Sequence, residues 1–183
     1  HDLSLKPPRK TMLDLLKDAG KDVIAVGKIF DIFDGEGVTE KIKTTGNTNG
    51  IAFTKALQTR DFEGLAFVNL VDFDMLYGHR RDVAGYAAAA TEFDHFLADF
   101  IPGMREGDLL IVTADHGCDP SYTKTTDHTR EYVPYLICGK GVKPGVDLGT
   151  KLCFGTIAHT ICDYLGVDAS SLDGQSVLPE ILK

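Results

Sequence analysis

The sequence predicts an α/β fold in which a mainly parallel sheet is flanked by helices on both faces. Apolar runs of strand length alternate along the chain with longer segments whose apolar residues recur at helical spacing. The strand-length runs are apolar on both faces, which is typical of parallel strands covered on both sides. A length of 183 residues with 43% hydrophobic residues suits a single packed domain and argues against a disordered chain.

The first part of the chain alternates between helix and strand. Apolar residues at Met12, Leu15, Leu16 and Ala19 predict a helix, and Gly20 stands where a C-capping glycine would end it. Residues 23–26 and 65–71 read as buried strands. Between them we expect a glycine-punctuated loop over 27–37, an exposed polar segment with a turn over 41–50, and a helix over about 51–60.

The second part repeats the alternation. Asp82 can cap a helix whose apolar stripe runs from Val83 to Phe100. Residues 109–112 and 133–138 read as strands, 155–165 as a helix and 177–182 as a short apolar segment. On these helices, His95 is expected at the surface and His159 in the core.

Composition limits the possible partners and the compartment. The net charge is −8 and there is no long basic run, so neither nucleic acid nor an anionic membrane is an expected partner, whereas a small phosphorylated substrate is compatible. No apolar run approaches the roughly 20 residues of a membrane span, and no signal peptide is recognisable. The first residue is not Met, so we expect a processed or truncated chain. The cysteines form no Cys-x-x-Cys pair, which predicts free thiols in a reducing cytoplasm: Cys118, Cys138, Cys153 and Cys162.

Acidic and histidine side chains gather where predicted strands end. Such ends meet at one edge of a parallel sheet, so these side chains should converge although they are far apart in sequence. Carboxylate oxygen and imidazole nitrogen suit ions such as Mn²⁺ or Zn²⁺. The candidate ligands are Asp74, His79, Asp115, His116 and His128. One ion rarely needs five protein ligands and two ions need about six, so the set favours a two-metal phosphoryl-transfer site with one ligand missing.

Other readings of nearby residues stay open. An aspartate such as Asp74 can cap a following helix, and Asp72 is placed outside the ligand set because it can hydrogen-bond to the backbone. Cys118 could serve as a soft ligand. Taken alone, Lys28 reads as a solvated lysine. Two further acids of the glycine-punctuated loop carry no compelled ligand role: Asp34 and Glu36.

Four segments resemble the phosphopentomutase (phosphodeoxyribomutase) family of the alkaline phosphatase superfamily. They are residues 27–37, 69–80, 113–117 and 126–134. The segment 113–117, Thr-Ala-Asp-His-Gly, would alone indicate only the superfamily, and the others make the resemblance specific. It runs in the family's order from near the first residue to the last.

The resemblance implies an isomerase that interconverts (deoxy)ribose 1-phosphate and (deoxy)ribose 5-phosphate. It implies two Mn²⁺ ions, with other divalent ions possible. Asp74, His79 and His128 match the ligands of one ion, and Asp115 and His116 match two ligands of the other. Lys28 matches a lysine that contacts the substrate phosphate. In this family a phosphorylated threonine passes its phosphoryl group through a sugar bisphosphate intermediate.

The chain departs from the family pattern in one respect. The nucleophilic threonine, a further metal-binding aspartate and most of the cap domain belong to an amino-terminal segment of the family that does not match any residue here. We therefore expect residues 1–6 to be the tail of a connection from the cap domain. Residues 7–183 would form the carboxyl-terminal part of an alkaline-phosphatase-like core that lacks the catalytic nucleophile. The sequence predicts no oligomeric state.

Two alternatives follow from that departure. The chain alone could be a metal-binding but catalytically inert fragment. Within enzymes, it could instead come from another phosphosugar mutase or a phosphatase of the same superfamily.

Overall fold

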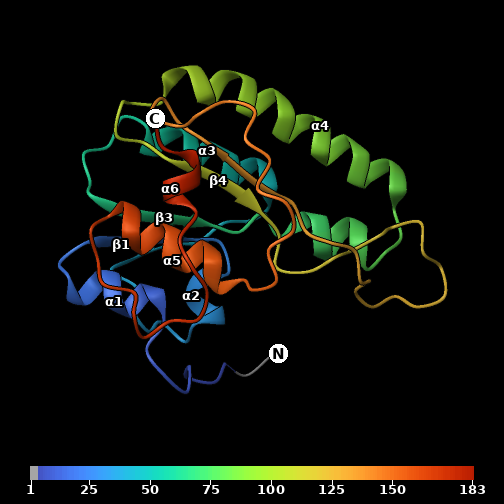
Figure 1. The fold of residues 1–183 in the computed structure, drawn as a ribbon. Helices are drawn as coiled ribbons and strands as arrows, with labels where there is room; N and C mark the ends of the chain where they lie inside the picture. The colour runs from blue at the N-terminus through green and yellow to red at the C-terminus, as the bar shows by residue number, and fades with distance from the viewer. Residues whose placement is uncertain (1–3) are drawn as a thin grey trace. The chain divides into compact units, whose positions relative to one another are not determined.

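The computed structural model describes residues 4–183, whose helices and strands are drawn in Figure 1. These residues divide into two compact units. The first unit comprises the described residues through Lys43 together with Arg60–Asn69 and Lys143–Lys183. The second comprises Thr44–Thr59 and Leu70–Val142. Of the connection predicted over residues 1–6, residues 1–3 lie outside the described part of the chain.

The first unit is built on a three-stranded parallel sheet with the strand order β2-β1-β3. Its central strand is buried from residue 23 to residue 26, which explains why that run is apolar on both faces. Ile24 pairs with Glu40 on one side and with Ala66 on the other. The elements of this unit are α1 (Met12–Asp18), β1 (Asp22–Val26), α2 (Ile29–Ile32), β2 (Glu40–Ile42), β3 (Gly64–Val68), α5 (Gly155–Tyr164) and α6 (Leu178–Ile181).

Helix α1 begins at a capping box and supplies much of the core of this unit. The Thr11 backbone N–H donates to the Asp14 carboxylate at 2.7 Å, which satisfies a donor that the helix start leaves open. Leu13 and Leu16 are fully buried and pack in one cluster with residues of β1. Leu16 of the predicted stripe is thus buried, and so is Leu13, which the stripe did not include. The helix ends at Asp18, and the predicted stripe residue Ala19 is exposed.

Glycine allows the ends of β1 and β3 to approach each other closely. Gly27 follows β1 with φ +82°, and a Cβ at this position would lie 2.6 Å from the carbonyl oxygen of Asn69. A side chain is therefore excluded both by the left-handed backbone and by the neighbouring peptide. The loop predicted over 27–37 contains the short helix α2.

The prediction of an exposed turn over residues 41–50 is wrong. β2 occupies its start, and Asn49 and Gly50 lie in the first turns of α3 (Asn47–Leu57). Asn47 is only 4% exposed. Its backbone N–H donates to Asp72 Oδ2 at 2.6 Å, and its Oδ1 accepts from the Asp72 N–H at 2.9 Å. This reciprocal pair satisfies one N–H at the start of α3 and the N–H of Asp72, and it outweighs the local turn preference.

The second unit contains the long helix α4 (Val83–Phe100) and the turns that precede it. The Asp82 carboxylate accepts from the Gly85 N–H at 2.9 Å, which confirms the predicted N-cap. α4 packs against α3 and against a π-helical turn, with Ala89 and Phe96 buried and His95 exposed. The other elements are η1 (the π-helix Phe73–Gly78), η2 (Ile101–Gly103), β4 (Leu110–Thr113) and β5 (Tyr135–Cys138).

Strands β4 and β5 pair in antiparallel fashion as a separate two-stranded sheet. The expectation that the strand before the Asp-His-Gly motif lies in the parallel sheet is therefore wrong. The structure describes the whole connection over 114–134 and places no helix in it, and an antiparallel pair needs no helical crossover. Within the described residues, no helix combines the length and the apolar character needed to cross a membrane.

Candidate metal centre

The π-helical turn η1 brings Asp74 and His79 onto one face. The His79 N–H donates to the Asp74 carbonyl at 2.9 Å, a bond between residues five positions apart. In an α-helix, with 3.6 residues per turn, such residues point about 140° apart. The wider π turn brings the fifth residue back to the same face, and His79 Nε2 lies 3.3 Å from Asp74 Oδ1.

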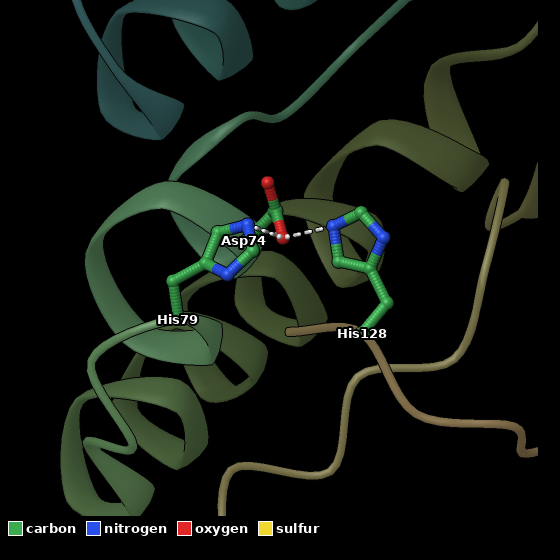
Figure 2. A group of neighbouring side chains, drawn as sticks. All are labelled: Asp74, His79 and His128. Atoms are coloured by element: carbon green, nitrogen blue, oxygen red, sulfur yellow. Dashed lines mark ion pairs between the residues drawn. The ribbon is translucent and has the colours of Figure 1, made fainter. Parts of the chain in front are cut away.

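His128 completes a group of three from a loop far along the chain. Its Nε2 atom also lies 3.3 Å from Asp74 Oδ1, so two imidazole rings face one carboxylate oxygen (Figure 2). Ligand atoms of the three side chains lie within 4.8 Å of one another. Among the residues that the structure describes, this is the group that could hold a metal ion.

The buried oxygen of Asp74 fits a cation. Asp74 Oδ1 is inaccessible to solvent and has no hydrogen-bond partner. An unsatisfied buried acceptor is unfavourable, and a carboxylate makes it more so because its charge also loses hydration. A divalent ion bound between this oxygen and the two Nε2 atoms would satisfy all three. The residues present therefore suit the kind of metal that the sequence predicts.

Hydrogen bonds to the other ring nitrogens leave Nε2 available. His79 Nδ1 lies 2.5 Å from the carbonyl oxygen of Thr126, which can only accept, so Nδ1 carries the proton. A neutral His79 then has its lone pair on Nε2, on the side of Asp74. His116 Nδ1 stands in the same relation to the Gly117 carbonyl at 3.1 Å. Such partners commonly orient metal-binding histidines.

Asp115 and His116, the predicted ligands of a second ion, lie beside this group. The His116 ring stacks on the His128 ring with centroids 3.6 Å apart. The Thr129 N–H donates to the Gly117 carbonyl at 3.1 Å, which joins the two loops. Asp115 directs an oxygen to within 3.7 Å of His116 Nε2, and its side chain is 74% exposed. The structure thus brings His116 next to the group of three, while Asp115 remains open to solvent.

Asp127 helps to hold His128 in place. The His128 N–H donates to the Asp127 carboxylate at 2.8 Å. That hydrogen bond, with the nearby His128 ring, lowers the pKa of Asp127. The backbone of a candidate ligand is therefore tied to an ionised neighbour.

The remaining candidates lie outside the group of three. Asp72 pairs with Asn47 at the start of α3, in keeping with its placement outside the ligand set. Burial raises the pKa of the Cys118 thiol, which disfavours the thiolate that a soft ligand would need. Lys28 is exposed and precedes α2 in the first unit.

The loop acids and the core histidine have other contacts. Glu36 forms an ion pair with Lys6 at 2.6 Å. Asp34 adopts a positive φ of 51° in the turn after α2. His159 is partly buried, with Nε2 3.1 Å from the Leu172 carbonyl.

Sequence reasoning missed Arg81. Its guanidinium forms hydrogen bonds to carbonyl groups around the candidate ligands, and its φ is +55°. An arginine two residues after His79 gives no sequence signal for such a role, because the carbonyls come from distant loops. Only the folded chain shows these contacts.

Comparison with known proteins identifies relatives along the whole chain. The profile of the Metalloenzyme superfamily matches residues 12–169. A protein of Lachnoclostridium phytofermentans named phosphopentomutase is 54% identical over 183 residues, which are 100% of this chain and 46% of that protein. One of Acetivibrio thermocellus with the same name is 52% identical over 181 residues, or 99% and 46%. The chain thus spans about half the length of these curated relatives, and the predicted family resemblance is confirmed.

A solved structure supports the fold. A phosphoglycerate mutase of Leishmania mexicana, crystallised at low cobalt concentration, superposes with a TM-score of 0.67 at 19% identity. The match covers 86% of this chain and 37% of that protein. At this identity the likeness concerns the fold, and it confirms the predicted α/β class with a parallel sheet and an alkaline-phosphatase-like core.

Proposed function

Because the chain belongs to the Metalloenzyme superfamily, we propose that it is the carboxyl-terminal core part of a phosphopentomutase. The reaction would interconvert (deoxy)ribose 1-phosphate and (deoxy)ribose 5-phosphate. Relatives that carry this name and are about half identical to the chain over the aligned residues support the choice of reaction. The observation that carries the proposal is the convergence of His79 and His128 on the buried, unpartnered oxygen of Asp74.

The proposed cofactor is a pair of divalent ions, Mn²⁺ in the first instance. Asp74, His79 and His128 would hold one ion. Asp115 and His116 would supply two ligands of the other. When bound, such ions stabilise negative charge on a phosphoryl group during its transfer and on the oxygens that exchange it.

Residues of this chain would prepare the site before substrate binds. Asp74 supplies a negative charge from a largely enclosed oxygen. The Thr126 carbonyl keeps the His79 proton on Nδ1, so that Nε2 is free to bind. Lys28 would contribute an ammonium group that binds the substrate phosphate as a point charge.

The proposed phosphothreonine is assigned outside this chain, because the family resemblance puts it in an amino-terminal segment that matches no residue here, and the contacts of nearby threonines give no reason to choose one of them instead. Thr113 is the last residue of β4. Thr126 accepts from His79 through its carbonyl, and the Thr129 hydroxyl donates to Glu131. The phosphoryl group would thus pass between a threonine elsewhere in the enzyme and the sugar, with a sugar bisphosphate as intermediate.

A second candidate concerns the 183 residues by themselves. Since they span about half the length of the relatives, they are proposed to bind metal without catalysing turnover.

The proposed compartment is a reducing cytoplasm. The four cysteines form no disulfide, which is compatible with that proposal.

The test is a turnover assay of the complete enzyme with ribose 1-phosphate and Mn²⁺. We expect ribose 5-phosphate to form, and His79→Ala and Asp115→Ala each to reduce turnover to background because a proposed ligand is lost. His95→Ala is the matched control, since His95 is an exposed histidine of α4 in the same unit. Full activity in either ligand variant would refute the assignment, and absence of turnover in the wild type would refute the reaction.

A further inference from the structure

We infer that Arg81 is a positioning residue, which holds two candidate ligands in place without touching the metal. This inference rests on the metal-binding part of the proposed function. Five side-chain hydrogen bonds of Arg81, as many as a guanidinium has N–H groups, go to backbone carbonyls. The guanidinium also interacts with the Cys118 thiol.

The five bonds join three segments of the second unit. Nε and Nη2 donate to the Thr125 carbonyl at 2.8 and 2.5 Å. Nη2 also donates to the Asp127 carbonyl at 2.5 Å. Nη1 donates to the carbonyls of Gly78 and Asp119, each at 3.1 Å.

These carbonyls lie next to the candidate ligands along the chain. Gly78 directly precedes His79, and Asp127 directly precedes His128. Thr125 and Asp127 flank Thr126, whose carbonyl orients the His79 ring. The guanidinium therefore fixes the peptides that set both imidazoles against Asp74.

The backbone of Arg81 supports a role for its side chain. Its φ of +55° lies in the left-handed region, which glycine adopts without strain and which other residues rarely adopt. An arginine here accepts strain that glycine would avoid. What arginine adds is the planar fork of donors that binds the four carbonyls.

The charge of Arg81 does not by itself favour a bound metal ion. A guanidinium beside a cation site repels the cation, so charge alone would weaken metal binding. The geometry of the fork is what lysine cannot reproduce, because an ammonium is a compact point charge with three donors. Replacement by lysine thus separates geometry from charge.

Two variants separate positioning from simple stabilisation. Arg81→Gly removes the guanidinium and also relieves the strained backbone, which protects the fold. Arg81→Lys keeps the charge and loses the fork. Arg80→Ala and Arg80→Lys are the controls, because the adjacent Arg80 is exposed.

The measurement is the dissociation constant of Mn²⁺ from the complete enzyme by calorimetry, well below the unfolding midpoint of each metal-free variant. We expect both Arg81 variants to bind Mn²⁺ about 10–100-fold more weakly, as is typical when a group that orients a metal ligand is lost. The Arg80 variants should match the wild type. If Arg81→Gly does not fold, the Mn²⁺ affinity of Arg81→Lys alone tests whether Arg81 positions the ligands.

Several results would overturn the inference. They are wild-type affinity in the Arg81 variants, full recovery of affinity by lysine, or a lowered unfolding temperature with unchanged affinity. A wild type that takes up no Mn²⁺ would overturn it together with the metal site. A wild type that binds Mn²⁺ but does not interconvert pentose phosphates would refute only the proposed reaction, and the affinity series would still decide the role of Arg81.

Discussion

Asp74 is the residue on which the candidate centre depends most. Its buried oxygen faces two imidazole nitrogens at 3.3 Å without a hydrogen bond. Asp74→Asn keeps the size of the side chain and removes its charge. We therefore expect calorimetry to show weaker Mn²⁺ binding, while the metal-free protein melts at the same or a higher temperature because an unsatisfied buried carboxylate oxygen is gone.

The control for this substitution is Asp94→Asn, on the exposed side of α4. It should leave the affinity unchanged. If Asp74→Asn bound Mn²⁺ as tightly as the wild type, Asp74 would not be a ligand.

Lys28 is predicted to act on the substrate and not on the metal. For Lys28→Ala we expect a raised KM for ribose 1-phosphate with an unchanged metal content, since a phosphate contact is lost and no ligand is. Steady-state kinetics and metal analysis test this together. Lys17→Ala, an exposed lysine at the end of α1, is the control. Loss of metal from Lys28→Ala would contradict the assignment.

At the scale of residues, the sequence indicated the ligand types but not what supports them. Asp74, His79 and His128 could be selected because carboxylate and imidazole at strand ends suit a metal. Arg81 and Asn47 could not, because their partners are backbone groups and side chains from distant segments. Such contacts exist only once the loops have been brought together.

At the scale of elements, the π-helical turn η1 depends on a glycine. A Cβ at Gly78 would lie 2.4 Å from Cys118 Sγ and 2.9 Å from the Phe73 carbonyl oxygen. We expect Gly78→Ala to destabilise the protein by ~1–3 kcal/mol, as overpacking commonly does. It should also weaken Mn²⁺ binding, because η1 places Asp74 and His79 on one face.

Thermal melting and calorimetry measure the two effects of Gly78→Ala. Gly141→Ala is the control, since a Cβ there would meet nothing within 4 Å. Adding Cys118→Ala should recover part of the lost stability by removing the closest contact. An unchanged melting temperature in Gly78→Ala would show that η1 adapts to the side chain.

The buried strand β1 could be predicted from its apolar run, and the N-cap of α4 from an aspartate before an apolar helical segment. The short elements α2 and β2 could not, because they are too brief to show a pattern. η1 could not be predicted, since a π turn has no pattern of 3.6 residues. The antiparallel pairing of β4 and β5 could have been anticipated from the absence of a helical segment over 114–134.

At the scale of the whole molecule, the chain spans about half of the relatives that it matches. We expect the isolated 183 residues to show no turnover of ribose 1-phosphate, because the proposed phosphothreonine lies outside them. They should nevertheless melt at a higher temperature with Mn²⁺, since a ligand that binds only the folded state stabilises it by about 2.7 kcal/mol at 100 times its dissociation constant. Sustained turnover by the pure 183-residue chain would contradict this account.

The central claim is that Asp74, His79 and His128 hold a divalent metal ion. The most direct test is anomalous X-ray diffraction from a crystal of the complete enzyme soaked in Mn²⁺. We expect one anomalous peak bonded to Asp74 Oδ1 and to Nε2 of both histidines, and a second peak at Asp115 and His116. Peaks elsewhere in the crystal, with none between Asp74 and the two imidazole rings, would contradict the claim.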